Sequence, residues 1–502
     1  MTRFIKILIF AVFILATLQA PVDLDLGWHL RYGEYFFQTG KVLKDNIISS
    51  VWPDYKWVQA SWGYDLLVYQ MFTRFGFIGL SLGSILITLL IFWLLIRPVA
   101  RFSPTELFLL GVIFLSQTPL LYYTGLRSQT PSTLLFALAL VIGDNLLKPH
   151  PSGIFARKKT LLLLPLIFLI WTNMHGGFTL GLAVLGILWM VHGLLILAHF
   201  KNWVKTPVIS LKNWLLFGIF FVASLAVPII NPWGIRIYEE TLKHSTNLNL
   251  TSITEWMPLT DNKIATVVAT VIAIFVLSLS LARRQILNLP IITAFLLITV
   301  FAFGAIRFLI LFGVMAVYFL AQNLPEVNLK LRKYKSFKKI NLVVTVLVIF
   351  LVVYDLTTTK VYFSPPNLKV LTFSWDDYCN FMQDCSERLT EAMLKNPPSG
   401  VGFNPYSYGG YLSWRVPQIK TFIDGRMSAW AVGDKTPPLV QSFQTVQDGG
   451  VLSFRQLDNL YHFRWVIIKT PTQTARYLEK LSQVGQWKIA YQDNNYSLYI
   501  KN

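Results

Sequence analysis

Charged side chains are scarce in this sequence, and acidic ones are the scarcest. Asp and Glu together supply 25 of the 502 residues, charged residues of both signs make up 14%, and hydrophobic residues make up 54%. A chain with so little charge and so much apolar surface does not have the composition of a soluble enzyme. The composition is typical of a polytopic membrane protein.

The sequence also lacks the short motifs of several large enzyme classes. It contains no Walker A loop, no Rossmann glycine fingerprint, no zinc-ligand spacing and no Gly-x-Ser-x-Gly elbow. These absences argue against an ATP-driven pump and against a serine hydrolase.

Cysteine is nearly absent, since only Cys379 and Cys385 are present. The pair does not indicate a metal site, because no second pair of ligands completes one. The topology derived below places both residues outside the cell, where thiols oxidise, so a disulfide is the favoured interpretation. The sequence alone leaves open whether they are bridged.

Apolar runs dominate what is present. A helix crosses a bilayer with roughly 17–25 apolar residues, and about eleven runs of suitable composition predict an α-helical membrane domain. The runs cover 4–20, 76–96, 105–122, 131–147, 160–174, 178–200, 213–230, 263–282, 286–304, 307–323 and 340–356.

The net charge of +19 does not indicate nucleic-acid binding, because the basic residues cluster in the loops after every second span. This positive-inside pattern predicts a multi-pass plasma-membrane protein with a cytoplasmic N-terminus and an extracytoplasmic C-terminal region. An alternative for residues 1–20 is a cleaved signal peptide. The clusters include Arg97/Arg101, Lys148/Lys158/Lys159, Lys201/Lys205/Lys212, Arg283/Arg284 and Lys330/Lys333/Lys338/Lys339.

Two domains are expected: a transmembrane domain over 1–360, with a long first outer loop at 21–75, and a soluble extracytoplasmic α/β domain over 366–502. Within the loop, 31–40 and 62–74 predict amphipathic surface helices, the first of which stops at Gly40. The C-terminal domain is predicted to have strands at 400–404, 420–424, 464–469, 486–492 and 496–500. Its helices are expected at 375–395, 405–415, 436–447, 453–462 and 472–484.

Asp23 and Asp25 follow the first apolar run directly, and His29 lies four residues further on. Two carboxylates at this spacing can share a hard divalent cation, Mg²⁺ or Mn²⁺, or one of them can act as a general base. The alternative is that they cap the helix that follows. We interpret Asp23, Asp25 and His29 as candidate catalytic residues. No cofactor other than this cation is indicated.

Arg127 and Arg307 each begin an apolar span at its predicted outer end. Arginine keeps its charge and binds phosphate through two hydrogen bonds, so both are candidates for holding an anionic substrate group. The alternative is that they extend to lipid headgroups or pair with an acid.

Three further motifs fall on the same predicted side. Asn173 and His175 lie in the break Trp171-Thr-Asn-Met-His-Gly-Gly-Phe178, and Glu255 precedes Trp256. We interpret Asn173, His175 and Glu255 as substrate-binding candidates, although a structural hydrogen bond for His175 is an equal alternative. The motif Asn231-Pro-Trp-Gly is typical of a helix-terminating turn.

These motifs resemble the GT-C superfamily of integral-membrane glycosyltransferases, and more closely an under-characterised bacterial GT-C-like family. The resemblance rests on Asp23-x-Asp25-x-Gly-Trp-His-Leu-Arg-x-Gly-Glu34, Asn173-x-His-Gly-Gly-Phe, Asn231-Pro-x-Gly and Gly409-Gly-Tyr…Phe-Ile-Asp424-Gly-Arg426. It implies that Asp25 or Asp23 is the base or metal-binding acid, and that Arg307 or Arg127 binds the lipid phosphate. Asp424 and Arg426 are further substrate-binding candidates.

The resemblance implies a membrane glycosyltransferase that moves a sugar from a polyprenyl-phosphate carrier to a glycan or lipid acceptor at the outer face of the bilayer. Protein N-glycosylation is disfavoured, because Ser374-Trp375-Asp376-Asp377 only partly matches the acceptor motif of oligosaccharyltransferases. A non-enzymatic carrier or assembly scaffold for lipid-linked glycans remains the alternative, as does a transferase that uses a pyrophosphate donor.

Overall fold

The structure is a computed structural model of the whole chain. It describes residues 2–18, 21–53, 55–97, 101–118, 125–246, 253–283, 288–331, 373–427, 430, 446 and 450–502. The contacts divide the chain into two compact units. Unit 1 comprises 1–20, 81–238 and 254–368, and unit 2 comprises 21–80, 239–253 and 369–502.

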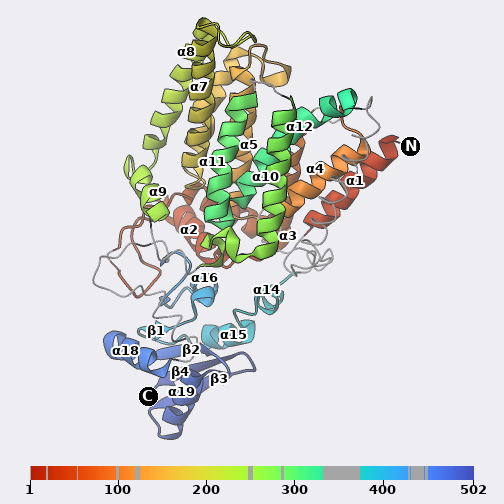
Figure 1. Ribbon diagram of the computed structural model, residues 1–502. Helices are drawn as coiled ribbons and strands as arrows, with labels where there is room; N and C mark the ends of the chain where they lie inside the picture. The colour runs from red at the N-terminus through yellow and green to blue at the C-terminus, as the bar shows by residue number, and fades with distance from the viewer. Residues whose placement is uncertain are drawn as a thin grey trace. The chain divides into compact units, whose positions relative to one another are not determined.

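Unit 1 is a bundle of helices (Figure 1). Helix α7 packs on α5, α8 and α11, and α12 packs on α4, α10 and α11. Phe13 of α1 stacks on Phe92 of α3 with ring centroids 4.6 Å apart. The helices are α1 (Thr2–Thr17), the second half of α3 (Trp62–Leu95), α4 (Pro104–Gln117), α5 (Gln129–Leu147), α6 (Leu163–Trp171), α7 (Phe178–Phe200), α8 (Leu211–Ala226), α10 (Lys263–Arg283), α11 (Leu289–Gly304) and α12 (Leu309–Leu331), while α9 (Arg236–Thr246) crosses the division between the units.

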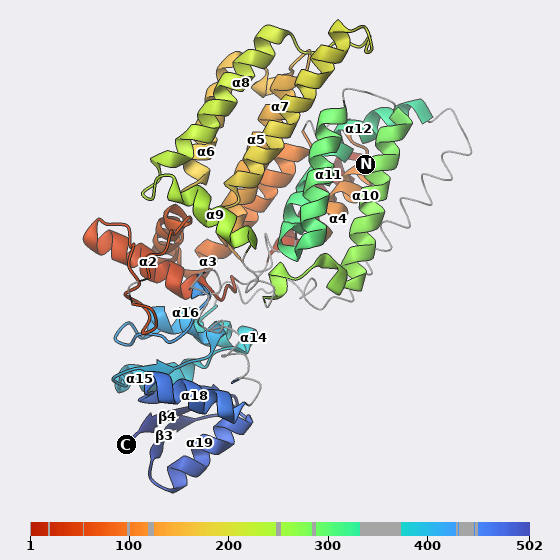
Figure 2. The ribbon, with the colours of Figure 1, turned by 60° about the vertical axis from the view of Figure 1, so that its left-hand side comes forward.

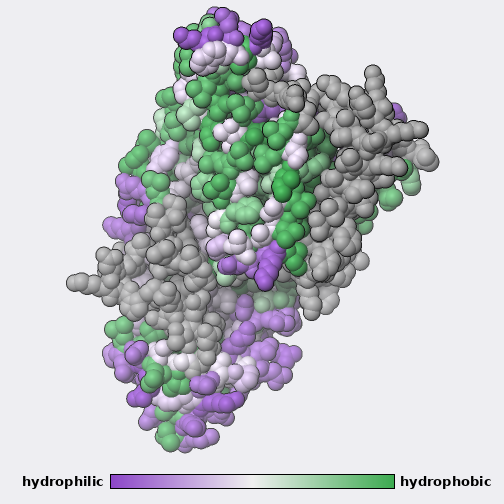
Figure 3. Space-filling model, viewed as in Figure 1, coloured by the Kyte–Doolittle hydropathy of each residue, from purple (hydrophilic) through white to green (hydrophobic). Residues whose placement is uncertain are grey.

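Several helices of the bundle have the length and the apolar surface of membrane spans. Within the described residues, six helices are long and apolar enough to cross a membrane, and α4 and α11 are shorter apolar helices. Large hydrophobic side chains such as Leu194, Ile219 and Val300 are more than half exposed, and hydrophobic residues cover the visible face around α10 and α11 (Figure 3). An exposed apolar surface of this extent requires a lipid environment. The chain is a multi-pass membrane protein.

Unit 2 begins with the segment after α1. Helix α2 (Leu26–Thr39) ends at Gly40, whose φ of +69° is the left-handed conformation that closes a helix. Helix α3 starts at Trp62 and is interrupted at Gly76, where φ is +58°. The predicted surface helices at 31–40 and 62–74 are therefore confirmed as helices, and the division between the units falls within α3, just after this break.

A four-stranded mixed sheet forms the second part of unit 2 (Figure 2). Its order is β1-β2-β4-β3, in which β1 and β2 are parallel and the other pairs are antiparallel. Helices α15 and α19 pack on the sheet. The strands are β1 (Gly402–Phe403), β2 (Trp465–Lys469), β3 (Trp487–Gln492) and β4 (Tyr496–Lys501), and the helices are α14 (Trp375–Met382), α15 (Glu387–Lys395), α16 (Tyr406–Arg415), α18 (Val451–Tyr461) and α19 (Gln473–Gln483).

The predicted small α/β domain is confirmed, with two differences. The helix expected at 375–395 is two helices, because the chain turns at Gln383 (φ +55°) between the bonded Cys379 and Cys385. The strand expected at 420–424 is wrong: Thr421 makes a single bridge with Ser49 and does not join the sheet. The span expected at 340–356 and nearly all of the helix expected at 436–447 lie outside the described residues.

The first outer loop, which was expected to belong to the transmembrane domain, lies in unit 2. Residues 21–80 form a unit with 369–502, joined by hydrogen bonds from Ser50 N to Thr421 O (2.8 Å) and from Thr421 N to Ile48 O (3.1 Å). Helix α2 lies so close to α16 that a Cβ on Gly27 would be 2.0 Å from the Gly410 carbonyl oxygen. The glycines of both motifs therefore allow this contact between helices.

Candidate functional site

In unit 1, the five loops that carry polar motifs meet at one end of the helix bundle. Asn231 Nδ2 donates to Asn173 Oδ1 at 3.0 Å, and His175 Nδ1 lies 3.1 Å from the Ser132 hydroxyl at the start of α5. The backbone N–H of Ile306 donates to the Met257 carbonyl at 3.0 Å. The polar motifs of unit 1 therefore lie close together, and their location on the outer side of a membrane stays a prediction.

Glu255 is the centre of a charged cluster that also contains Arg127, Arg307 and His175. Its Oε2 lies 3.7 Å from Arg127 Nη1 and accepts a hydrogen bond from Gln129 Nε2 at 3.5 Å. Burial raises the pKa of the Glu255 carboxyl, but the positive charges of Arg127 and Arg307 outweigh burial, and the pKa lies below its usual value. The carboxylate is therefore charged at neutral pH.

Arg307 is held in place by an aromatic ring. Its guanidinium carbon lies 4.0 Å from the ring centroid of Trp256, the neighbour of Glu255. A cation on a ring face is stabilised without losing its hydrogen-bond donors. Among the described residues, this cluster has two guanidinium groups and one carboxylate. Guanidinium groups of this kind can bind an anion such as a phosphate.

Asn173 and Asn231 connect the turns between helices. Asn231 Nδ2 also lies 3.3 Å from the Thr172 carbonyl, and Asn231 Oδ1 accepts from the Trp233 N–H at 3.0 Å. Asn173 Nδ2 donates to the Leu169 carbonyl at 2.7 Å. Each of these bonds fixes backbone, and a substrate-binding role for Asn173 stays a prediction.

Asp23 and Asp25 lie in unit 2, where Asp25 is the residue before the first turn of α2. Its Oδ1 accepts a hydrogen bond from Trp28 Nε1 at 2.8 Å. Asp23 is buried, its Oδ1 accepts from the Asp25 N–H at 3.2 Å, and its carbonyl accepts from the Tyr378 hydroxyl at 2.5 Å. Asp23 therefore holds the turn, while Asp25 is a partly exposed residue.

His29 has a buried acidic partner. Its Nδ1 lies 2.5 Å from Asp65 Oδ1, and Asp65 Oδ2 accepts from Gln59 Nε2 at 2.9 Å. The ring also lies between Trp28 and Tyr64, with centroids 3.5 and 4.7 Å away. A carboxylate on one ring nitrogen fixes the orientation of the imidazole. Both His29 and Asp65 are buried, and the catalytic role of His29 stays a prediction.

Asp424 and Arg426 form a fully buried ion pair. Arg426 Nε donates to Asp424 Oδ1 at 2.8 Å and Nη2 donates to Oδ2 at 2.6 Å, in the two-pronged geometry that arginine favours. The remaining Nη1 donates to the Tyr32 hydroxyl at 3.0 Å. Both side chains are inaccessible to solvent, so a substrate reaches them only if this pair opens.

The predicted site residues thus fall into two groups. Unit 1 brings together Arg127, His175, Glu255 and Arg307, with Asn173 in the adjacent turn. Unit 2 holds Asp23, Asp25, His29, Asp424 and Arg426. The sequence did not identify the residues that contact these side chains, because a local pattern does not report which distant residue a side chain contacts. These partners are Asp65, Gln59, Tyr32, Gln129 and Ser132.

Comparison with solved structures places this architecture among known folds. The archaeal oligosaccharyltransferase AglB from Archaeoglobus fulgidus, in complex with an inhibitory peptide and a dolichol-phosphate, superposes with a TM-score of 0.56. It is 12% identical over 95% of this chain and 70% of its own. ArnT from Cupriavidus metallidurans bound to undecaprenyl phosphate gives 0.54 and 10% identity over 99% of this chain and 97% of its own. This chain has the GT-C fold. No protein-family model and no curated protein matches the sequence.

Proposed function

We propose that this protein is a glycosyltransferase that moves a sugar from a polyprenyl-phosphate carrier to a glycan or lipid acceptor at the outer face of the plasma membrane. The observation that carries the proposal is the pair of arginines, Arg127 and Arg307, around Glu255 at one end of a bundle with the GT-C fold. The positive-inside charge pattern supports an outer location for that end. The C-terminal part of unit 2 is then extracytoplasmic, which agrees with the Cys379–Cys385 disulfide.

In this proposal Arg127 and Arg307 bind the phosphate of the donor. Charge builds up on that phosphate as the bond between the sugar carbon and the phosphate oxygen breaks, and fixed cations stabilise it. Glu255 holds both guanidinium groups in the absence of donor. The phosphate then replaces the carboxylate as their partner.

Asp25 is the proposed general base. The acceptor hydroxyl attacks the anomeric carbon, its proton passes to the Asp25 carboxylate, and polyprenyl phosphate leaves. Trp28 Nε1 donates to one oxygen of Asp25 at 2.8 Å, which helps to fix the orientation of this carboxylate. The reaction is a single displacement and inverts the configuration of the sugar carbon.

As an alternative to the general-base role of Asp25, we propose that Asp23 and Asp25 bind a divalent cation. Two carboxylates separated by one residue suit Mg²⁺ or Mn²⁺, but Asp23 already binds the Asp25 N–H. Within the part of the chain that the structure describes, no three His, Cys, Asp or Glu side chains are grouped so as to hold a metal ion. A cation would therefore take its remaining ligands from water or substrate, and chelation would abolish transfer.

The test is native mass spectrometry of the purified protein with undecaprenyl phosphate, phospho-sugar polyprenols and ordinary anionic lipids. We expect selective retention of the polyprenyl phosphates, lost in Arg307→Ala and Arg127→Ala and kept in Asp25→Asn, which should bind donor and fail to transfer. If the polyprenyl phosphates are retained no better than phosphatidylglycerol, the proposed donor site is contradicted. Donor binding together with full transfer by Asp25→Asn would instead favour another base.

The alternative function is a carrier or assembly scaffold for lipid-linked glycans. It would use the same cations, but Asp25 would be dispensable. Normal complementation of a deletion strain by Asp25→Asn, with loss in Arg307→Ala, would favour this alternative.

A further inference from the structure

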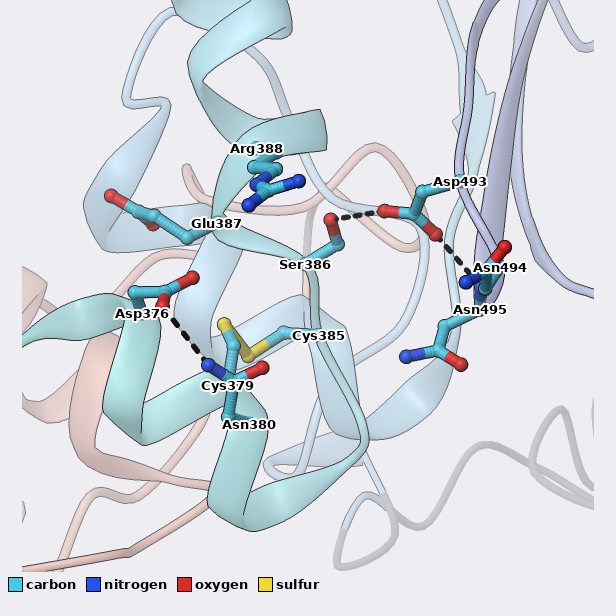
Figure 4. Close-up of a pocket in the computed structure, with 10 residues that line it drawn as sticks. All are labelled: Asp376, Cys379, Asn380, Cys385, Ser386, Glu387, Arg388, Asp493, Asn494 and Asn495. Carbon is cyan, nitrogen blue, oxygen red and sulfur yellow. Dashed lines mark hydrogen bonds between the residues drawn. A yellow bond between two sulfur atoms is a disulfide. The ribbon is translucent and has the colours of Figure 1, made fainter.

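Unit 2 contains a small polar groove whose lining does not include the acids proposed for catalysis. It has a volume of about 290 Å³ and lies between the α14–α15 segment and the turn from β3 to β4. Figure 4 shows its walls: Asp376 and Asn380 of α14 and Glu387 at the start of α15 on one side, and Asp493 and Asn494 on the other. The volume is at the lower end of the range for small-molecule sites, roughly 300–1,000 Å³, and suits one sugar ring rather than a lipid.

The two walls are held in a fixed geometry. The Cys379–Cys385 disulfide joins α14 to the loop before α15, and Ser386 Oγ donates to Asp493 Oδ2 at 2.7 Å. Asp493 Oδ1 accepts the backbone N–H groups of Asn495 and Tyr496 at 2.8 and 2.7 Å. A groove that is already ordered loses little conformational entropy when a ligand binds.

Glu387 is a lining residue of this groove, and one of its carboxylate oxygens is buried. Its Oε1 pairs with Arg415. Its Oε2 is buried and has no hydrogen-bond partner among the residues that the structure describes, and the side chain as a whole is 10% exposed. A buried carboxylate oxygen without a donor is costly. A ligand that donates a hydrogen bond to Oε2 would remove that cost.

The chemistry of the walls favours an uncharged ligand with many hydroxyls. Carboxylates accept hydrogen bonds from hydroxyls, whereas the amides of Asn380 and Asn494 both donate and accept. The lining contains three carboxylates and one guanidinium group. The carboxylates are those of Asp376, Glu387 and Asp493, and the guanidinium is that of Arg388. This balance disfavours a phosphate or another anion. Among the described residues no cluster of metal-ligand type is found, which favours a sugar over a cation.

We propose that this groove binds a neutral sugar residue of the acceptor glycan. The inference rests on the proposed glycosyltransferase function and extends it, because it specifies a glycan as the acceptor and gives it a binding site separate from the donor phosphate. Donor and acceptor would then be recognised by different chemistry: arginines for the phosphate, and carboxylates and amides for the hydroxyls.

The test measures binding of neutral trisaccharides of glucose, galactose, mannose and xylose to the full-length protein in nanodiscs, by saturation-transfer NMR and calorimetry. At least one trisaccharide should bind, and Asp376→Asn and Asn494→Ala should each weaken it tenfold or more. Both residues are exposed, so neither change should unfold the domain. Glu479→Gln, an exposed acid on α19 outside the groove, should change the affinity less than twofold.

Three results would overturn the proposal: no trisaccharide binds, the same affinity persists in both groove variants, or Ca²⁺ or inorganic phosphate binds in place of sugar and is lost in those variants. Retention of undecaprenyl phosphate, measured on the same samples, separates the two proposals. If the lipid is retained and the sugar result is negative, the acceptor site alone fails. If the lipid is not retained, the glycosyltransferase proposal fails.

Discussion

The carboxylate of Asp25 lies against the α-carbon of Gly425: a Cβ built on Gly425 would be 1.9 Å from Asp25 Oδ1. These residues are 400 positions apart in the chain, yet they occupy one unit. On either side of Gly425, Asp424 and Arg426 are locked together, and Arg426 reaches Tyr32 of α2. The C-terminal part of the chain therefore determines where the proposed base stands.

The first prediction follows from this contact. Gly425→Ala should push the Asp25 carboxylate aside and lower the rate of transfer at least tenfold, because a displacement of about an ångström is enough to disable a positioned group. Undecaprenyl phosphate should still be retained, since Arg127 and Arg307 belong to unit 1. The control is Gly111→Ala, where the new methyl would meet Phe13 and Phe92 at ordinary distances of 3.6 and 3.8 Å. Wild-type transfer by Gly425→Ala would show that the position of Asp25 against Gly425 is not needed.

The second prediction concerns the buried pair next to it. Arg426→Met should leave the Asp424 carboxylate buried without its partner and destabilise unit 2 by about 3–5 kcal/mol, read as a lower midpoint of thermal unfolding. The double variant Asp424→Asn/Arg426→Met should lose less stability than Arg426→Met alone, because it leaves no uncompensated buried charge. If Arg426→Met instead keeps its stability and loses substrate affinity, the residue binds substrate as the sequence suggested.

Much of the fold could be predicted because its signals are local. The apolar runs marked the helices, and Gly40 ended α2 where the pattern indicated. The alternating stretches marked β2, β3 and β4. The strand expected at 420–424 failed because an alternating pattern shows that a segment is extended but not what it pairs with: Thr421 bonds to Ile48 and Ser50 instead of the sheet.

The candidate site was predictable as a set of residue types but not as a set of partners. Charged residues at the ends of apolar runs are costly unless something uses them, and this principle identified Arg127, Glu255 and Arg307 before the structure joined them. The partnership of Arg426 with Tyr32 spans 394 positions. Such contacts are fixed by tertiary packing, so no local pattern reports them.

The third prediction is a pH dependence set by Glu255. Its pKa is lower in the folded protein than in an unfolded chain, so its pairing with the arginines stabilises the fold fully above the ordinary glutamate pKa, near 4.5. That contribution is lost as the pH falls through the lowered value. The midpoint of thermal unfolding of the wild type should therefore drop faster below about pH 4.5 than that of Glu255→Gln. Parallel curves for the two proteins would show that the carboxylate contributes nothing.

The fourth prediction uses the same residue to probe the donor site. Because the Glu255 carboxylate and a lipid phosphate are proposed to compete for Arg127 and Arg307, Glu255→Gln should bind undecaprenyl phosphate several-fold more tightly at neutral pH. The matched control is Glu239→Gln, an acid in the first turn of α9. Weaker binding by Glu255→Gln would mean that the acid holds the arginines in their binding geometry instead of competing with the ligand.

The last prediction concerns the disulfide that joins α14 to the loop before α15. Cys379 and Cys385 are six positions apart and both are buried. Closing so short a loop restricts the unfolded chain only modestly, so replacing both with Ser should cost about 2 kcal/mol of stability. The larger consequence should be for the groove, because this bond ties its α14 wall to Cys385, the neighbour of Ser386. Trisaccharide affinity should fall in the double serine variant, and the wild type treated with a reductant should lose the same amount. Equal affinity with and without the bond would show that the hydrogen bond from Ser386 to Asp493 is enough to hold the wall.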